Sequence, residues 1–341
     1  MTAVATPNPT TTGDGPALDV VGIGNALVDV ISQESDELIT ALGLAKGAMT
    51  LIEEDDATAL YERMGPGVEI SGGSGANTMV GIAALGGRAQ YIGKVRDDQL
   101  GAVFGHDLRA TGVIYEVPPA QSGPGTGRCL IMVTPDAQRT MNTYLGASVA
   151  FEPGDVDESV IRAARVLYLE GYLFDRPAAQ EAFRQAARIA HDAGALVAVT
   201  LSDPFCVERH RQAFLELVES HVDLVFANEL EALSLYETDD LDEVARRFAE
   251  HSAVAAVTRS EKGSVVIAGE DRIVVPALPV ERVVDTTGAG DLYAAGFLYG
   301  YSRGHDLRRC AELGSVLAAE VISHIGARPE ADLAVLAADL L

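Results

Sequence analysis

The stretch Asp285-Thr286-Thr287-Gly288-Ala289-Gly290-Asp291 comes directly before an apolar, glycine-spaced run from Leu292 to Tyr301. That run predicts a buried helix. A strand and a tight glycine turn before it would leave the N–H groups of residues 288–290 at the positive end of the helix dipole, which is an anion site. Because a carboxylate repels phosphate, we interpret Asp291, in the first helical turn, as a base for a hydroxyl that attacks a phosphate. An ordinary aspartate at a helix N-terminus is the alternative.

The composition limits the partners of this chain. Its 341 residues include 50 acidic and 25 basic side chains, which give a formal net charge of −25, and 48% of the residues are hydrophobic. This length allows one large α/β domain or two smaller ones. The negative charge argues against nucleic acid and against a membrane as partners. It also opposes ATP, so a phosphate site here would depend on helix dipoles, a few basic groups and a divalent cation.

Three features predict a cytoplasmic protein. The three cysteines, Cys129, Cys206 and Cys310, are widely spaced without a metal-like pattern, as is typical of reduced cytosolic thiols. Residues 1–16 lack the basic start and apolar core of a signal peptide, and we expect them to form a disordered tail. No run approaches the roughly 18 to 20 apolar residues that a membrane helix needs.

Alternation of two patterns predicts the fold class. From Val166 onward, short β-rich runs alternate with helical patterns, as in ALVAVTLS (195–202), VERHRQAFLELVES (207–220) and VDLVFA (222–227). Near the start, ALDVVGIG (17–24) predicts a strand and residues 74–85 predict a helix. The expected fold is α/β, with a doubly wound, mostly parallel sheet and helices on both faces.

Two segments, about 31–70 and 113–145, interrupt this alternation. The first predicts short helices and a strand. The second predicts the strands VIYEVP (113–118), TGRCLIMVTP (126–135) and QRTMNTYLG (138–146), with a turn at Asp136-Ala137. We expect them to form a small β lid inserted into a single domain of residues 17–341. It would lie over the carboxyl ends of the parallel strands, where ligands bind in open α/β sheets.

The run Gly22-Ile23-Gly24-Asn25 follows the first strand and is similar to the start of a dinucleotide-binding motif. The third glycine of that motif would fall at Leu27, so the fingerprint fails and argues against a dehydrogenase. Asn25 and Asp29 remain as a polar pair at an apolar strand end. On one continuous strand their spacing would point both side chains into one cavity. A buried turn-capping role is the alternative.

The run Ser71-Gly72-Gly73-Ser74-Gly75-Ala76-Asn77 contains three glycines and opens the helix predicted at residues 74–85. Glycines let a ligand approach the backbone closely, and an asparagine can donate to and accept from a vicinal diol. We therefore expect Gly72, Gly73 and Asn77 to bind substrate, with a simple flexible turn as the alternative.

Further candidates lie on the expected phosphate-donor side. Asn228 and Glu231 form either a helix-capping pair or water-mediated ligands of Mg²⁺. The segment from Thr258 to Gly263 follows another strand and would form a backbone turn at ATP. Arg139, at the lid hairpin, would close onto transferring phosphoryl oxygens, unless it is a solvated hairpin arginine.

The order and placement of these motifs match one family. From about residue 18 to residue 335 the chain resembles the ribokinase-like (PfkB) carbohydrate kinases through GNALVD, SGGSGAN, ANELE, VTRSEKGS and, most specifically, DTTGAGD. It is most similar to the adenosine kinase branch, through GLAKGAMTLIEED before SGGSGAN and Leu201-Ser202-Asp203-Pro204-Phe205 after a central strand. Two departures from the family pattern are Ser260, where glycine is usual, and the charge of Asp203 near a pocket for a purine.

The resemblance implies the roles of the substrate-side residues. Asp291 would deprotonate a 5′-hydroxyl beside the anion hole. That hole would consist of Gly288, Ala289 and Gly290. The ribose hydroxyls would be bound by Asp29, Gly73 and Asn77. Tyr172 and Phe205 are the candidates for the wall against the base.

The resemblance also implies the cofactors. The co-substrate is Mg·ATP, with Asn228, Thr258, Gly263 and Thr287 on its side of the site. Many relatives bind a potassium ion near the anion hole, which here would lie beside Asp285, Thr287 and the 323–326 loop.

The function expected from this resemblance is ATP-dependent phosphorylation of a nucleoside 5′-hydroxyl, with adenosine converted to AMP. A sugar kinase acting on ribose, a ketose or 2-keto-3-deoxygluconate is the alternative in the same fold. A non-catalytic nucleoside-binding protein is the alternative from another class. The lid sheet would either form a homodimer or only cover the site.

Overall fold

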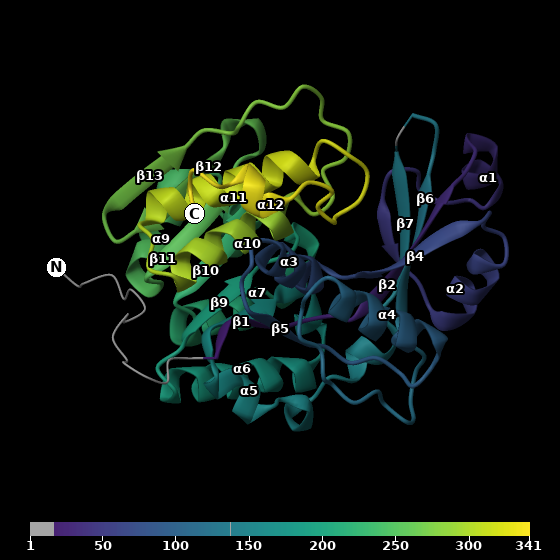
Figure 1. Cartoon of the computed structure of the whole chain (residues 1–341), viewed down its shortest axis with the longest axis horizontal. Helices are drawn as coiled ribbons and strands as arrows, with labels where there is room; N and C mark the ends of the chain where they lie inside the picture. Colours follow the sequence, from purple (N-terminus) through teal and green to yellow (C-terminus); the bar gives the residue numbers. More distant parts are fainter. Residues whose placement is uncertain (1–16, 137) are drawn as a thin grey trace.

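The computed structural model describes residues 17–136 and 138–341 (Figure 1). The tail expected at residues 1–16, and Ala137 of the expected turn, lie outside the described residues. Figure 1 shows a large α/β body with a smaller sheet at one side. Within the described ranges, no helix combines the length and the apolar character that a membrane crossing requires.

The larger sheet has eight strands in the order β13-β12-β11-β10-β9-β8-β1-β5. Its strands are β1 (Leu18–Ile23), β5 (Ala89–Ile92), β8 (Ala164–Glu170), β9 (Leu196–Thr200), β10 (Leu224–Asn228), β11 (Val254–Thr258), β12 (Ser264–Ala268) and β13 (Asp271–Val275). All pairs from β5 to β11 are parallel, and β12 and β13 extend one edge with antiparallel pairs. Apolar runs such as LVAVT in β9 are typical of parallel strands buried on both faces.

Helices cover both faces of this sheet. Neighbouring strand residues belong to different cores: Val20 packs in one and Val21 in the other, and both are fully buried. One face carries α3 (Ser74–Ala84), α10 (Ala289–Ser302), α11 (Leu307–Val321) and α12 (Leu333–Leu336); the other carries α5 (Glu158–Arg162), α6 (Pro177–Asp192), α7 (Pro204–His221), α8 (Glu229–Tyr236) and α9 (Leu241–His251). The predicted doubly wound α/β fold is confirmed.

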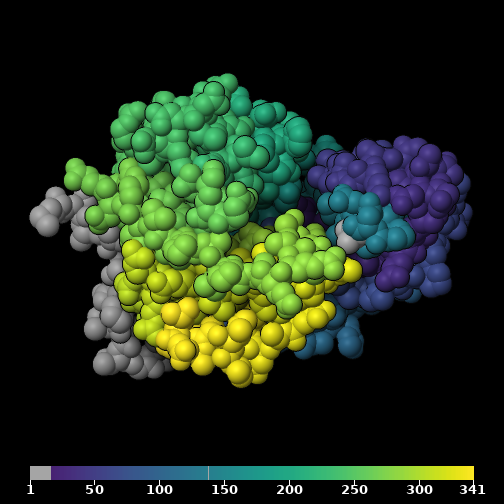
Figure 2. Space-filling view, turned by 90° about the horizontal axis from the view of Figure 1, so that it is seen from above, coloured from purple at the N-terminus to yellow at the C-terminus, as the bar shows by residue number. Residues whose placement is uncertain are grey.

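The smaller sheet has five strands in the order β3-β7-β6-β2-β4. Its elements are β2 (Leu27–Gln33), β3 (Met49–Leu51), β4 (Gly67–Gly72), β6 (Gly127–Val133), β7 (Arg139–Tyr144), and the helices α1 (Asp36–Ala41), α2 (Glu54–Tyr61) and α4 (Gln99–Ala110). Seen from above, the surface is hollowed where this purple part meets the green and yellow body (Figure 2). The chain enters this sheet at residue 27, earlier than the predicted start near 31.

Two predicted strands are wrong. In VIYEVP only Ile114 pairs, through an isolated bridge with Gln90 of β5. The consecutive prolines 118 and 119 that follow have no N–H with which to continue a ladder. The strand expected before Asp285 is also absent, because β13 ends at Val275 and Pro276 follows, and residues 276–288 contain no helix or strand.

A buried ion pair connects the two sheets. Arg139, the first residue of β7, donates from Nη1 to Oδ2 of Asp285 in the segment before α10, and both side chains are over 90% buried. The same oxygen accepts from the Gly326 N–H at 2.9 Å. Oδ1 accepts from the Thr287 N–H at 3.0 Å and from its hydroxyl at 2.7 Å. Asp285 therefore joins the smaller sheet, the start of α10 and the loop after α11.

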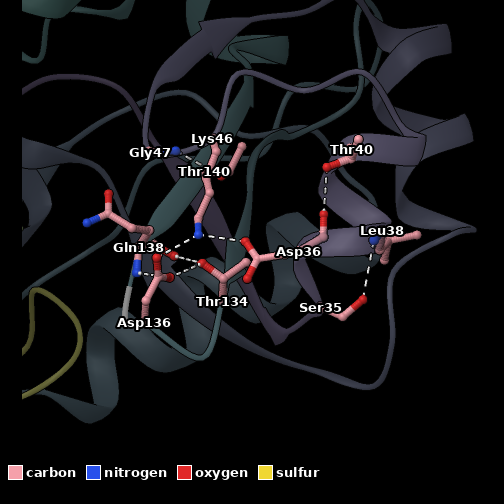
Figure 3. A network of polar contacts seen from close by, with 10 residues as sticks. All are labelled: Ser35, Asp36, Leu38, Thr40, Lys46, Gly47, Thr134, Asp136, Gln138 and Thr140. Atoms are coloured by element: carbon pink, nitrogen blue, oxygen red, sulfur yellow. Dashed lines mark hydrogen bonds and ion pairs between the residues drawn. The ribbon is translucent and has the colours of Figure 1, made fainter.

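An exposed network supports the hairpin that carries Arg139 (Figure 3). Nζ of Lys46 lies 2.6 Å from Oδ1 of Asp36 in α1 and 2.6 Å from Oδ2 of Asp136 at the β6–β7 connection. The Thr134 hydroxyl donates to Oδ1 of Asp136 at 2.7 Å. Hydrogen bonds from Lys46 and Thr134 lower the pKa of Asp136 to about 2. This network ties the hairpin to α1 at the solvent-facing side.

The buried ion pair of Arg139 and the exposed ion pairs of Lys46 are expected to differ in their contribution to stability. The substitution Asp285→Asn leaves the Arg139 guanidinium buried without its counter-charge, and it should lower the free energy of unfolding by about 3 kcal/mol. The substitution Lys46→Met removes the two exposed pairs with Asp36 and Asp136, which solvent screens, so it should lower stability far less. Denaturant unfolding followed by circular dichroism measures both. Equal losses in the two variants would show that the buried pair is not the principal connection.

Candidate active site

The residues expected to form the anion site lie at the beginning of α10. Gly288 is the N-cap, with φ of 79°, and a Cβ there would lie 2.7 Å from the Cβ of Ala327, so this position requires glycine. Gly290 has open space where a side chain would stand. The Ala289 N–H donates to the Thr286 carbonyl at 3.2 Å, so in this structure it closes a turn. Asp291 lies in the first turn, as predicted.

Asp291 is held by two side chains of α3. Its Oδ1 accepts from the Ser74 hydroxyl at 2.6 Å and its Oδ2 from Nδ2 of Asn77 at 2.9 Å. Burial raises the pKa of Asp291, and these two hydrogen bonds and the charge of Arg328 oppose that rise. Among the described residues Oδ1 of Asn77 is buried without a hydrogen-bond partner. It is therefore an acceptor that a ligand hydroxyl could satisfy.

Asp29 approaches this cluster from the smaller sheet. It lies in β2 beside Gly72, where a Cβ would collide with its carboxylate. Burial raises the pKa of Asp29 to about 6; the charges of Arg328 and Arg139 lower it and that of Asp291 raises it. Gly73, the N-cap of α3, follows directly. The structure thus brings Asp29 and Gly72 of the smaller sheet together with Gly73, Asn77 and Asp291 at the starts of α3 and α10.

Asn25 lies in this region for a different reason from the one predicted. It is not on one strand with Asp29, because the chain leaves β1 at Ile23 and enters β2 of the other sheet at Leu27. Its N–H and Nδ2 donate to Oε1 of the buried Glu170 at 3.2 and 2.8 Å. The Gly75 N–H donates to Oε2 at 2.6 Å. Glu170 therefore fixes the crossing between the sheets against the start of α3.

The two residues expected at the base differ in exposure. Tyr172 is half-buried. Burial is the largest cause of its raised pKa, and the negative charges of Asp203 and Glu231 raise that pKa further. Its hydroxyl therefore lies near carboxylates. Phe205, at the beginning of α7, is 71% exposed, so it does not form an enclosed wall in this structure.

Asn228 and Glu231 form the capping arrangement that was the structural alternative. Oδ1 of Asn228 accepts from the Glu231 N–H at 2.8 Å, and the Asn228 N–H donates to Oε2 of Glu231 at 2.9 Å. Burial raises the pKa of Glu231 to about 7, and the charges of Asp203 and Asp291 add to the rise. Across residues 17–136 and 138–341, no group of three or more histidine, cysteine or acidic side chains is arranged to hold a metal ion directly.

The expected ATP turn follows β11. Ser260, where the resemblance expects glycine, has φ of 50° in the left-handed region that favours glycine. Gly263 has φ of 84°, and a Cβ there would collide with the Val275 carbonyl. The backbone of this turn is therefore of the glycine type although serine occupies one position.

The carboxylate of Asp285, which the resemblance places beside a potassium ion, is already engaged by protein donors. A carboxylate has about four lone-pair sites. Those of Asp285 receive the Thr287 N–H and hydroxyl, the Gly326 N–H and the Arg139 guanidinium. The Thr287 hydroxyl donates to the same carboxylate, and its own oxygen lone pairs stay available. Arg139, expected at phosphoryl oxygens, here contacts Asp285.

Three residues of the site were missed by sequence reasoning. Ser74 lies three positions before Asn77, and this helical spacing could have revealed it. Glu170 is a charged residue at the end of an apolar strand, which is a detectable anomaly. Arg328 has no local signal, because its contacts are to residues about 250 positions earlier.

Glu170 predicts a pH dependence of stability. Burial raises its pKa from the ordinary 4.5 to about 7, so the folded protein binds this proton more tightly than the unfolded chain does. Protonated Glu170 stabilises the folded protein fully at a pH below the pKa that this residue has in the unfolded chain. That contribution is lost as the pH rises through the pKa of Glu170 in the folded protein. Glu170 should thus lower the free energy of unfolding by at most about 1.4 kcal/mol per pH unit across that interval.

Removal of this carboxylate should flatten the profile. Denaturant unfolding between pH 4.5 and 8 should give a smaller slope for Glu170→Gln than for the wild type, with a residual slope because Asp29 and Glu231 shift in the same direction. The exposed Glu158→Gln is the matched control and should keep the wild-type slope. An unchanged slope in Glu170→Gln would contradict this assignment.

The chain is similar in sequence and fold to known proteins. A family model described as pfkB family carbohydrate kinase matches residues 36–333. The structure of adenosine kinase from Sinorhizobium meliloti is 54% identical, with a TM-score of 0.88, over 95% of this chain and 99% of that chain. A probable sugar kinase protein from Rhizobium etli CFN 42 is 50% identical, with a TM-score of 0.89 and the same coverage.

A more distant relative agrees over nearly its full length. Adenosine kinase of Saccharomyces cerevisiae is 28% identical over 331 residues, which are 90% of this chain and 95% of the yeast protein. These similarities confirm the resemblance and the fold that were predicted from DTTGAGD and its companion motifs. The chain belongs to the pfkB family of carbohydrate kinases and is an ATP-dependent, adenosine kinase-like enzyme.

Proposed function

We propose that this protein transfers the γ-phosphoryl group of ATP to the 5′-hydroxyl of a nucleoside, and that adenosine, converted to AMP, is its substrate. One observation carries the proposal: Asp291, at the N-terminus of α10, is held by Ser74 and Asn77. Asp29 approaches from the smaller sheet. The similarity to two adenosine kinases supports the choice of nucleoside.

The ribose would bind between the two sheets. Asp29 supplies carboxylate oxygens, and Oδ1 of Asn77 is a buried acceptor without a partner among the described residues. Two vicinal hydroxyls would satisfy these acceptors, which are costly to leave unpaired. This arrangement would place the 5′-hydroxyl toward Asp291.

Asp291 would receive the proton of the 5′-hydroxyl. Its pKa is raised by burial, which brings it closer to that of a useful base. It is still far below the pKa of an alcohol, so the proton would move late, as the new P–O bond forms. Ser74 and Asn77 fix the carboxylate, and the open backbone side of Gly290 would admit the phosphoryl group beside the helix dipole.

The charge distribution fits Mg²⁺ on the ATP side. The charges of Asp203 and Asp291 both raise the pKa of Glu231, so the carboxylates on this side of the site repel one another. Oxygen ligands and retained waters suit this ion, so Asn228 and Glu231 would hold it through water. When bound, it would neutralise charge on the phosphates of ATP. The turn between Thr258 and Gly263 would lie beside the nucleotide.

Arg139 would contribute to phosphoryl transfer if its guanidinium left Asp285 and paired with the phosphoryl group instead. Its guanidinium is paired with Asp285 next to the anion site. A phosphoryl group there would offer oxygens that suit the same planar donors. The smaller sheet, which carries Arg139, would then act as a lid that excludes water from the transfer.

A sugar kinase is the second candidate. The probable sugar kinase protein of Rhizobium etli is 50% identical over nearly its whole length. The exposure of Phe205 also leaves the site without an enclosed wall for a purine. A free sugar would use the same Asp29, Asn77 and Asp291.

A substrate panel tests the proposal. Phosphorylation by the purified protein with Mg·ATP is measured for adenosine, inosine, guanosine, cytidine, ribose, fructose and 2-keto-3-deoxygluconate, with and without potassium. Adenosine is expected to give the highest kcat/KM. Preference for a sugar would overturn the nucleoside assignment and support the second candidate, and no turnover on any of them would overturn both.

The role of Asp291 is tested by substitution. Asp291→Asn should reduce kcat by about 100- to 10,000-fold, because a positioned base is lost while the fold remains. Asp306 is a matched control, because its Oδ1 caps α11 by accepting from the Arg309 N–H at 3.0 Å and an asparagine caps equally well. Asp306→Asn should keep wild-type kcat. Near wild-type turnover in Asp291→Asn would exclude it as the base.

A further inference from the structure

The loop after α11 reaches both halves of the candidate site. The Gly326 N–H donates to Asp285 at 2.9 Å, and Ala327 packs against Gly288 at the N-cap of α10. Arg328 then extends to the other half, the junction between β4 and α3. Three consecutive residues therefore contact the anion site and the segment that carries Asn77.

We propose that Arg328 is a positioning residue for phosphoryl transfer: it fixes the β4–α3 junction and supplies the positive charge that offsets Asp29 and Asp291. This inference rests on the proposed function of the same site.

The hydrogen bonds of Arg328 hold the junction at both ends. Nε and Nη2 donate to the Ser71 carbonyl at 3.2 and 2.5 Å, and Nη2 also donates to the Ser71 hydroxyl at 2.8 Å. Nη1 reaches the Ala76 carbonyl at 3.5 Å. The intervening residues include Gly72, Gly73 and Ser74, so one guanidinium spans the whole turn.

Ser71 is fixed from its other side as well. Its N–H and hydroxyl donate to Oδ2 of Asp107 in α4 at 2.8 and 2.5 Å. Asp107, Ser71 and Arg328 thus form a chain of contacts from α4 through β4 to the loop after α11. The planar fork of arginine can serve several carbonyl and hydroxyl acceptors at once, which a lysine cannot do.

The charge of Arg328 matters because its surroundings are acidic. The groups that face it are Asp107, Asp29, Asp291 and Tyr91. Its charge lowers the pKa of both Asp29 and Asp291, against the effect of burial. The charge of Arg139 also lowers the pKa of Asp29. For Asp291, the charge that opposes the effect of burial is that of Arg328.

Substitution separates the two roles. Arg328→Met removes the charge and the hydrogen bonds, and Arg328→Lys keeps the charge but not the fork. Arg309 is the matched control, because it also donates to main-chain carbonyls, those of Leu340 at 2.6 Å and Leu341 at 3.2 Å, at the C-terminus. Arg309→Met should lower stability without changing the pH profile of activity.

The first readout is the pH profile of kcat/KM for the substrate that the panel identifies. Loss of the positive charge raises the pKa of Asp29 and Asp291, so the acidic limb of Arg328→Met should move to higher pH by about one unit. At pH 7 kcat/KM should fall about 10- to 100-fold because the junction is misplaced. Arg328→Lys should keep the acidic limb of the pH profile at the wild-type pH and lose part of kcat/KM.

The second readout does not require turnover. Hydrogen–deuterium exchange of peptides within residues 67–84 should become faster in Arg328→Met and should stay at the wild-type rate in Arg309→Met. A wild-type pH limb together with wild-type exchange in Arg328→Met would overturn the proposal. If that variant does not fold, wild-type kinetics and exchange in Arg328→Lys would overturn the fork role. A wild type inactive on the whole panel would overturn the proposed function alone, because exchange still decides the role of Arg328.

Discussion

The carboxylate of Asp285 is the interaction on which the arrangement of the two sheets depends. It receives Arg139 from the smaller sheet, Thr287 from the start of α10 and the Gly326 N–H from the loop after α11. Burying these charges is compensated only because all four acceptor sites are used. One side chain, that of Asp285, therefore positions the anion site, the smaller sheet and the loop after α11. This explains why an acidic residue stands where phosphate is expected to bind.

The second constraint is electrostatic. The chain has a net charge of −25, and Asp29, Glu170, Glu231 and Asp291 all have a raised pKa in or around the site. Burial is the largest cause for each. Neutral donors such as the Gly75 N–H and Nδ2 of Asn77 hold some of these oxygens, and Arg139 and Arg328 supply the nearby positive charge. Under the proposed function, this charge distribution would favour hydroxyls and a phosphate accompanied by a cation over a bare anion.

The sequence predicted what is local. The apolar run from Leu292 to Tyr301 is the buried helix that it predicted, and the alternating runs after Val166 are the strands and helices of the larger sheet. The expected strand VIYEVP failed because the prolines after it end the ladder.

Contacts between segments far apart in the chain could not be predicted from local sequence patterns. Nothing near Arg139 in the sequence indicates its partner 146 positions later, and the bonds of Glu170 to Asn25 and Gly75 cross from β8 to the start of the chain. At Ser260 the backbone conformation could not be read from the residue type. The turn keeps the left-handed geometry typical of glycine, although serine stands at this position.

The route of the chain through the two sheets has a consequence for folding. β2 pairs with β6, so that Leu27 is partnered with Gly127, and the intervening segment supplies β5 to the larger sheet and α3 to one of its faces. Closing a loop of that length costs entropy before any contact repays it. The smaller sheet should therefore assemble late, on a body that already contains β1 and β5. Since its strands come from two separated segments, it cannot be excised as an independent folding unit.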